Sequence, residues 1–222
     1  MIYRIPVLFF LLSLFILTSC SSVKVLNAWK SDTANKLRSK NTLVIVRTDN
    51  NKARVAFEEA IAMKLRQRGV NATESYKHLP KLDPNKKLDE NDVREAKEMI
   101  RGKGFNGVVL SVMKEKNLNL LGKKDGGYWA GATYAGYYPI YYSGFSGYYS
   151  NPASYMNYGG NYVPETFPNE TSVTYILETL AYDLDAGEDE QLVAVVTSSV
   201  ENPESAHQAA KDYANKIANS FK

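Results

Sequence analysis

Two mainly apolar runs, separated by two amphipathic helix patterns, constrain the fold more than any other feature of the sequence. Thr42–Arg47 and Gly107–Met113 are almost continuously apolar over the length of a strand. Such runs are typical of strands that are covered on both faces. Strands with helices between them can pair in parallel, because a parallel crossover needs about a dozen residues or more. The sequence therefore predicts an α/β domain with a mixed sheet.

The residues between these runs carry two helix patterns with recognisable ends. In the first, apolar side chains recur at helical spacing, and the polar residues between them are expected to face solvent. The inward positions are Ala53, Phe57, Ala60, Ile61 and Leu65, and the outward positions are Arg54, Glu58, Lys64 and Arg68. Asp49-Asn50-Asn51 offers caps for this helix, and Gly69 is its expected stop. Asp89 caps the second helix, which runs to Arg101.

The C-terminal part predicts a hairpin and a last helix. Ser172–Leu184 and Gln191–Val200 have the pattern of antiparallel strands that turn at Asp185–Glu188. Asn202 is the expected cap of the final helix, with Pro203 at the first helical position. The apolar stripe of this helix consists of Ala206, Ala210, Tyr213, Ile217 and Phe221. With two β-α units before it, the hairpin completes a single α/β domain.

The first twenty residues have the pattern of an export signal. Ile5–Leu17 is an almost unbroken apolar run behind Arg4, and it ends in Leu17-Thr18-Ser19-Cys20. The run is too short to span a bilayer and has the length of a signal-peptide core. Its ending resembles the lipobox of bacterial lipoproteins, in which an aliphatic residue and two small residues precede a cysteine. The resemblance implies cleavage after Ser19 and lipidation of Cys20. The alternatives are an ordinary secretory signal, or a leader with an incidental cysteine.

The residue after the cysteine bears on the membrane that the protein occupies. In Gram-negative lipoproteins an aspartate just after the cysteine commonly retains the protein in the inner membrane, whereas here Ser21 follows. The resemblance therefore implies the periplasmic face of the outer membrane. A single acyl chain binds a membrane marginally, whereas two or three chains anchor a protein stably. The membrane is thus an expected partner, bound through acyl chains such as palmitate on Cys20.

These patterns divide the chain into a signal peptide at residues 1–19, a lipidated tether at 20–40 and an α/β domain at 41–221. The tether includes a possible short strand at Val23–Trp29. Within Asn41–Pro80, a strand, an amphipathic helix, an Arg-Gly pair and a second strand at Val70–Tyr76 follow one another. This order resembles small periplasmic lipoprotein domains: uncharacterised lipoprotein domains of unknown function, the N-terminal domain of TolB, and the lipoprotein activators of penicillin-binding proteins. The resemblance carries no catalytic residue and implies only fold and compartment.

A tyrosine- and glycine-rich insertion at residues 122–168 interrupts the domain. Its centre, Gly126–Pro164, has no charged side chain in 39 residues and holds 11 of the 16 tyrosines. Four interpretations are open: a flexible loop, a loop folded back on the sheet with its hydroxyls in water, a recognition surface, and a membrane-inserted hairpin. The tyrosines around Pro139 lie on both parities, which disfavours the inserted hairpin. The rings are densest at the expected contact surface, which consists of Trp129, Tyr137, Tyr138, Tyr141 and Tyr142.

The composition argues against catalysis and against nucleic acid as a partner. The only cysteine excludes an internal disulfide, and a net charge of +3, or +2 once Arg4 is removed, gives no basic footprint. His78 and His207 belong to no nucleophile motif. The glycines of Gly102–Gly107 follow a helix instead of preceding one, which is the wrong order for a dinucleotide site. The acidic run Asp183–Glu190 lacks the spacing of a calcium loop and is expected to be a solvated turn. We therefore expect no enzymatic activity, cofactor, metal site or nucleotide.

Together, these patterns predict an outer-membrane-anchored periplasmic lipoprotein that acts as a non-catalytic binding or scaffold domain. The aromatic insert is the expected contact surface for an envelope protein or for a glycan such as peptidoglycan. The alternative is an accessory subunit of an envelope assembly or transport complex, in which the insert is a passive loop.

Overall fold

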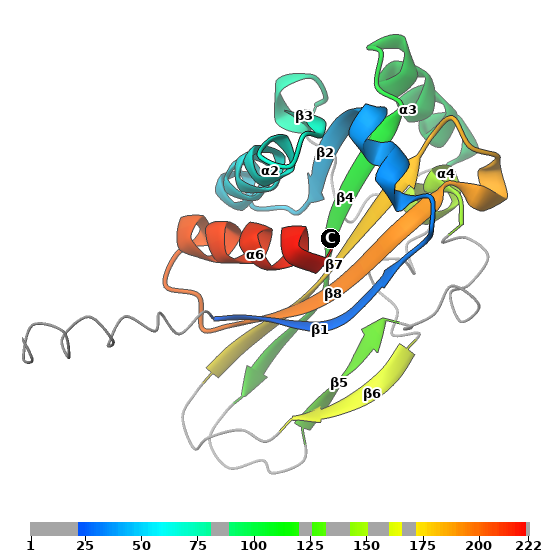
Figure 1. The fold of residues 1–222 in the computed structure, drawn as a ribbon. Helices are drawn as coiled ribbons and strands as arrows, with labels where there is room; N and C mark the ends of the chain where they lie inside the picture. The colour runs from blue at the N-terminus through cyan, green and yellow to red at the C-terminus, as the bar shows by residue number, and fades with distance from the viewer. Residues whose placement is uncertain are drawn as a thin grey trace, which may run out of the picture.

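The computed structural model describes residues 22–80, 89–119, 126–131, 143–150, 160–165 and 172–220. Its centre is a six-stranded mixed sheet with the strand order β1-β8-β7-β4-β2-β3 (Figure 1). The strands are β1 (Val23–Lys30), β2 (Asn41–Arg47), β3 (Asn71–Glu74), β4 (Gly107–Asn119), β7 (Ser172–Asp183) and β8 (Leu192–Glu201). Strands β4, β2 and β3 are parallel to one another, and the other neighbours are antiparallel. The predicted α/β fold with a mixed sheet is confirmed.

Helices cover both faces of this sheet. They are α2 (Asn51–Arg66), α3 (Glu90–Gly102), α4 (Phe145–Ser150) and α6 (Ala206–Ser220), with short 3-10 helices η2 (Ala34–Ser39), η3 (Ser75–Lys77) and η6 (Glu188–Glu190). Helices α2 and α6 pack on one face, called here the α2/α6 face, and α3 and α4 on the other, the α3/α4 face. A separate two-stranded sheet is formed by β5 (Gly126–Gly131) and β6 (Gly160–Glu165).

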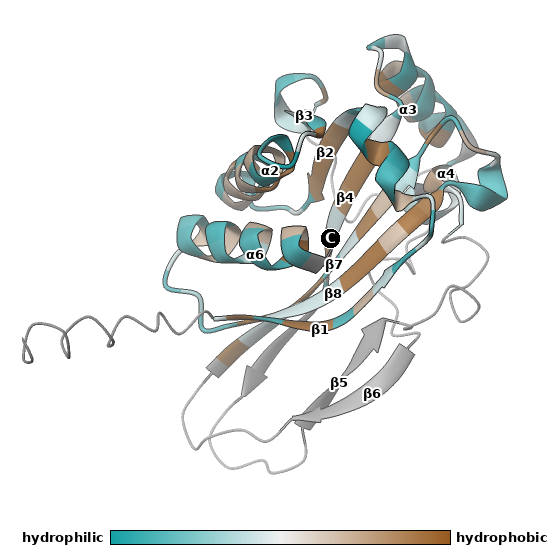
Figure 2. Ribbon diagram, viewed as in Figure 1, coloured by the Kyte–Doolittle hydropathy of each residue, from teal (hydrophilic) through white to brown (hydrophobic). Residues whose placement is uncertain are grey.

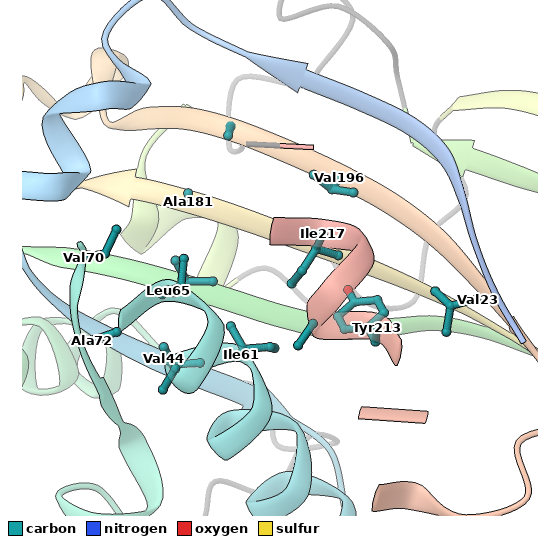
Figure 3. Close-up of a cluster of buried hydrophobic side chains, with 14 of the residues drawn as sticks. Val23, Val44, Ile61, Leu65, Val70, Ala72, Ala181, Val196, Tyr213 and Ile217 are labelled. Carbon is teal, nitrogen blue, oxygen red and sulfur yellow. The ribbon is translucent and has the colours of Figure 1, made fainter. Parts of the chain in front are cut away.

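The central strands supply both cores because their side chains alternate between the faces. Along β4, Val108 and Leu110 belong to the core of the α3/α4 face, whereas Val109 belongs to the core of the α2/α6 face. Figure 2 shows the apolar residues concentrated on these central strands. Figure 3 shows the core of the α2/α6 face, where Ile61 and Tyr213 lie between the sheet and the two helices. The continuous apolar runs in the sequence are thus explained by burial on both sides.

Local signals at the helix ends fixed the positions of α2 and α3 correctly. The side chain of Asn50 accepts a hydrogen bond from the amide of Ala53 at 3.1 Å. Asp89 and Asp92 form a capping box at the start of α3. After α2, Gly69 has a φ of +81°, a backbone conformation that favours glycine.

The prediction that Arg54 and Glu58 face solvent is wrong. Their exposed fractions are 6% and 0%, because η3 covers this flank of α2. The carboxylate of Glu58 accepts hydrogen bonds from the backbone amides of Val46 and Tyr76, at 3.1 and 2.7 Å. It also accepts bonds from Arg54 Nε at 3.0 Å and Ser75 Oγ at 2.7 Å. Glu58 therefore joins α2 to the end of β2 and to the residues that follow β3, so the predicted strand Val70–Tyr76 stops at Glu74.

The predicted cap of the last helix is also wrong. Asn202 has a φ of +41° and pairs with Val173, donating its amide to the carbonyl and accepting the Val173 amide with its side chain. The hydroxyl of Ser205 instead accepts the amide of Gln208 at 3.2 Å, and α6 begins at Ala206. The predicted stripe is buried where the structure describes its central residues, Ala210, Tyr213 and Ile217, while Phe221 lies outside the described residues.

The strand at the start of the chain belongs to the sheet. Val23 pairs with Val200 in β8, and the carbonyl of Ser22 accepts the amide of Glu201 at 2.8 Å. A domain boundary at residue 41 therefore leaves out one edge strand. The sequence shows the strand pattern of β1, but its partner lies at the other end of the chain, and no local signal connects the two.

Candidate functional site in the anchored insert

The middle of the insert is part of the protein core. Helix α4 carries Phe145, Tyr148 and Tyr149, whose exposed fractions are 1%, 0% and 2%. They belong to the core of the α3/α4 face together with Leu180 and Tyr182 of β7. For residues 143–150, the interpretation of a loop folded back on the sheet is therefore confirmed.

The rings around α4 contact one another in favourable arrangements. Phe145 stacks on Tyr149 with ring centroids 5.1 Å apart and meets Tyr182 edge-on at 5.8 Å. Tyr148 lies tilted against Tyr182 at 6.5 Å. Stacked and edge-on pairs contribute roughly 0.5–1.5 kcal/mol each beyond the apolar area that they bury. Four rings thus fill this part of the core.

Backbone contacts hold the same segment against the turn between β7 and β8. The carbonyl of Ser143 accepts the amide of Leu192 at 3.0 Å, and the amide of Phe145 donates to Gln191 Oε1 at 3.2 Å. A Cβ on Gly144 would lie only 3.1 Å from a backbone oxygen of the turn. The approach is therefore close enough to favour glycine at this position.

A hydrogen bond from Tyr148 to a buried ion pair of the sheet connects α4 to β4 and β7. The hydroxyl of Tyr148 donates to Glu178 Oε1 at 2.6 Å, and Lys114 Nζ lies 3.6 Å from the same oxygen. The side chains of Glu178 and Lys114 are 0% and 8% exposed. Burial lowers the pKa of Lys114, although the Glu178 carboxylate opposes the shift. The expectation that the insert tyrosines keep their hydroxyls in water is wrong for Tyr148, because its hydroxyl satisfies a buried carboxylate.

A second cation holds the end of α4. Arg47, the last residue of β2, donates from Nη1 to the carbonyl of Tyr149 at 2.8 Å. Its guanidinium lies 5.7 Å from the centroid of the Tyr149 ring, within the range of a cation–π contact. The sequence alone does not identify Arg47, Lys114 and Glu178 as site residues. The available signal was a charged residue at the end of an apolar run or inside an apolar strand.

The expected contact residues lie mostly outside the described part of the chain. Trp129 is in β5, where it pairs with Tyr162 of β6. Tyr137, Tyr138, Tyr141 and Tyr142 lie outside the described residues, as does Cys20.

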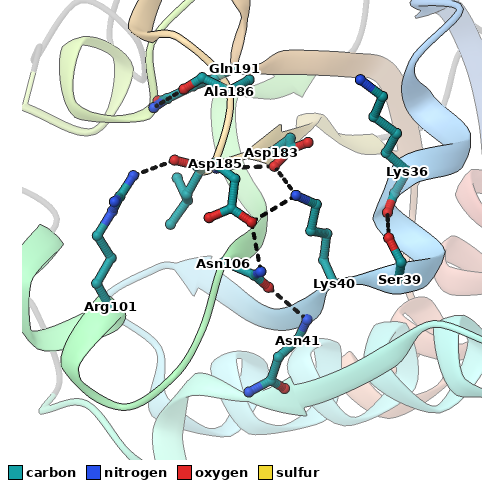
Figure 4. Close-up of polar contacts among 11 residues, drawn as sticks. Lys36, Ser39, Lys40, Asn41, Arg101, Asn106, Asp183, Asp185, Ala186 and Gln191 are labelled. Atoms are coloured by element: carbon teal, nitrogen blue, oxygen red, sulfur yellow. Dashed lines mark hydrogen bonds and ion pairs between the residues drawn. The ribbon is translucent and has the colours of Figure 1, made fainter.

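The acidic turn is less solvated than expected. Lys40 Nζ lies 2.7 Å from Asp183 and 2.8 Å from Asp185, and Asn106 also donates to Asp185 (Figure 4). Asp183 is only 4% exposed, which corrects the prediction of a solvated turn for this residue. The hydrogen bond from Lys40 lowers the pKa of Asp185, against the effect of burial. In the described ranges, no group of three or more His, Cys, Asp or Glu side chains is arranged to hold a metal ion.

The two histidines lie on the surface at separate places. His78 is exposed and its ring meets Phe105 edge-on at 5.5 Å. His207 is exposed in the first turn of α6. His78 follows η3, whereas His207 lies at the start of α6, and the structure does not bring the two side chains together.

No helix within the described part of the chain combines the length and apolar character needed to cross a membrane.

The sequence matches no protein-family model and no curated protein. Among solved structures, it is similar to the PelC dodecamer from Paraburkholderia phytofirmans, with a TM-score of 0.40 and 9% identity over 90% of this chain and 95% of that one. A variant of the same PelC gives a TM-score of 0.40 and 12% identity over 90% and 96% of the two chains. A TM-score of 0.40 is too low for these matches to support an inference.

Proposed function

We propose that the protein is a non-catalytic binding or scaffold domain of the bacterial envelope, held at the periplasmic face of the outer membrane by a lipid on Cys20. Its aromatic insert is the contact surface, and an envelope protein or peptidoglycan is the partner. The lipobox pattern at Leu17–Cys20 supports the anchor.

The observation that carries the binding role is the attachment of the insert at its middle as well as at its ends. The insert leaves the sheet after Asn119 and returns at Ser172, two residues that pair with each other. Between them, α4 is fixed in the core by Tyr148 and its neighbours. The attachment divides the insert into two shorter segments. Shorter segments lose less conformational entropy when they bind a partner.

The residue types of the insert support recognition. Tyrosine and tryptophan offer large contact areas with few rotatable bonds, and they are enriched where proteins bind partners. Aromatic faces of this kind also suit sugars. The four tyrosines at 137, 138, 141 and 142 lie three to eight residues before the start of α4 in the sequence.

The test changes insert tyrosines that precede α4 and leaves the buried rings of α4 in place. Deleting Gly126–Pro164 would remove α4 and its buried rings, so the sharper variant replaces Tyr137, Tyr138, Tyr141 and Tyr142 with Ser in the full chain. The matched control replaces the same four residues with Phe, which keeps the rings. Binding is measured by co-sedimentation with purified peptidoglycan sacculi and by crosslinking in envelope extracts, together with the melting temperature.

We expect the Ser variant to lose binding and the Phe variant to keep most of it, with similar melting temperatures. Undiminished binding by the Ser variant would contradict the contact role. The insert would then be a passive loop, as in an accessory subunit that docks through its sheet edge or helices.

A further inference from the structure

The lipid on Cys20, on which this inference rests, would be held very close to the folded body. Ser22 is fixed by the hydrogen bond from Glu201, and Val23 is 1% exposed in the core. Only Ser21 lies between Ser22 and Cys20. An extended chain covers about 3.5 Å per residue, so the lipidated residue is at most about 7 Å from Ser22. The end of the molecule that carries Ser22 must therefore lie at the membrane surface.

An open groove of about 490 Å³ lies at this same end. Residues of β2, β4, β7 and β8 line it from the sheet, and residues of the first two turns of α2 and the first turn of α6 line it from the helices. The larger apolar side chains that line it include Val46, Phe57, Met113, Tyr175, Leu177 and Val200. Met113 is 38% exposed, although it is a large apolar residue.

The groove and the tether share one strand pair. Val200 lines the groove and pairs with Val23, three residues after Cys20. The rim consists of Thr48–Asn50, at the start of α2, and of Pro203 and Ser205, at the start of α6. The groove therefore opens where the short tether brings the body against the membrane.

We propose that this end of the molecule docks on the lipid bilayer and that the groove between α2 and α6 receives phospholipid acyl chains. The apolar lining is then removed from water, which adds binding energy to that of the covalent anchor. Tyr175 suits a membrane interface because its ring is apolar and its hydroxyl is polar. The exposed Met113 provides a flexible apolar contact.

Charges near the rim are mixed in sign. Lys24 pairs with Glu201 at 2.7 Å beside the tether, while Asp49 and Lys52 lie at the start of α2. A membrane site that selects anionic lipids needs a cluster of basic residues. Docking is therefore expected to depend on apolar contact and to change little when anionic lipid or salt is added.

Three methionines provide a matched experiment. Met113 lies in the groove, whereas Met63 on α2 and Met99 on α3 are both 41% exposed and do not line it. Each is changed to Cys in the full, lipidated chain (Met113→Cys, Met63→Cys, Met99→Cys), where Cys20 is blocked by its lipid. Each thiol carries the same fluorophore, and the proteins are incorporated into phosphatidylcholine vesicles that contain acyl-chain nitroxide lipid. Mass spectrometry confirms the lipid on Cys20, and melting temperatures confirm the fold.

The label at Met113 is expected to be quenched about threefold or more relative to the two controls, as for a group at the boundary of headgroups and acyl chains. Equal quenching at the three positions in lipidated, vesicle-bound protein would overturn the docking while leaving the anchor intact. A mass without lipid at Cys20 would overturn the anchor and this inference together. Strong quenching at Met63 or Met99 with none at Met113 would place a different face on the membrane.

Discussion

The two faces of the sheet are covered by different means. Helices α2 and α6, with 16 and 15 residues, pack side by side on one face, over a core rich in alanine and valine. On the other face, α3 has 13 residues and α4 only six, and the remaining space is filled by rings. These rings are Phe105, Phe145, Tyr148, Tyr149 and Tyr182.

The difference shows that a segment with the composition of a loop can supply part of a core. A short helix covers little of the sheet surface. The α3/α4 face therefore relies on large side chains and on the buried pair Lys114–Glu178. The α2/α6 face uses small residues and helix–helix contacts, such as Phe57 against Tyr213 at 5.5 Å. Substitutions of the same kind should therefore have different effects on the two faces.

The largest expected effect is the loss of a ring from α4. Tyr148→Ala removes a fully buried ring and the hydrogen bond to Glu178, and should destabilise the protein by about 3–5 kcal/mol. Met99→Ala, at an exposed position of α3 on the same side of the sheet, is the control and should change stability by less than about 0.5–1 kcal/mol. Urea unfolding at pH 7 measures both. Equal effects would mean that α4 does not belong to the core.

Removing one hydroxyl from each face compares the two cores directly. Tyr148→Phe leaves the buried Glu178 carboxylate without its tyrosine donor and should cost about 1.5–3 kcal/mol. Tyr213→Phe removes a neutral bond to Thr179, which keeps its contact with Ser111, and should cost about 0.5–1.5 kcal/mol. The difference in unfolding free energy is the readout. A larger loss for Tyr213→Phe would reverse the comparison.

A third tyrosine should respond in the opposite direction. The hydroxyl of Tyr182 is buried without a hydrogen-bond partner among the described residues, and burial raises its pKa well above the ordinary value. Tyr182→Phe removes this unsatisfied group and should leave stability unchanged or raise it by up to about 1 kcal/mol. Thermal unfolding detects the change. A clear loss of stability would show that the hydroxyl has a partner.

The smallest expected effect concerns the ion cluster at the β7–β8 turn, which both faces share. The hydrogen bond from Lys40 holds the pKa of Asp185 below its unfolded value, so this contact stabilises the fold above pH of about 4. The contribution is lost as the pH falls through the folded pKa. Asp185→Asn should therefore lower stability slightly at pH 7, and its difference from the wild type should vanish as the pH falls below about 4, so that the acid loss is flatter in the variant. An unchanged acid profile in urea titrations would rule out this contribution.

The elements that the sequence predicts correctly are those whose signals are local. Asn50, Gly69 and Asp89 mark helix ends through their own backbone and side-chain chemistry. The sequence pattern places Arg54 and Glu58 toward solvent, because helical spacing alone cannot show that η3 covers the same flank of α2. Their burial depends on residues that follow the next strand.

The site was only partly predictable for the same reason. The spacing of Phe145, Tyr148 and Tyr149 is that of one helix face and could have distinguished α4 from the surrounding loop. The partners of α4, Lys114 and Glu178, come from β4 and β7, and only the pairing of these two strands brings them together. The insert is glycine-rich and its centre has no charged residue, so its composition is that of a loop and does not indicate a short core helix.

Amide hydrogen exchange at α4 tests most directly whether the middle of the insert is a core element. The amide of Tyr148 donates to Gly144 at 3.1 Å, and the amide of Leu192 donates to Ser143 at 3.0 Å. If α4 is part of the core, both amides should exchange as slowly as those of central β8 residues such as Val195, through opening of the whole domain. Exchange of the Tyr148 and Leu192 amides at the rate of an unprotected chain, with Val195 still protected, would contradict the account.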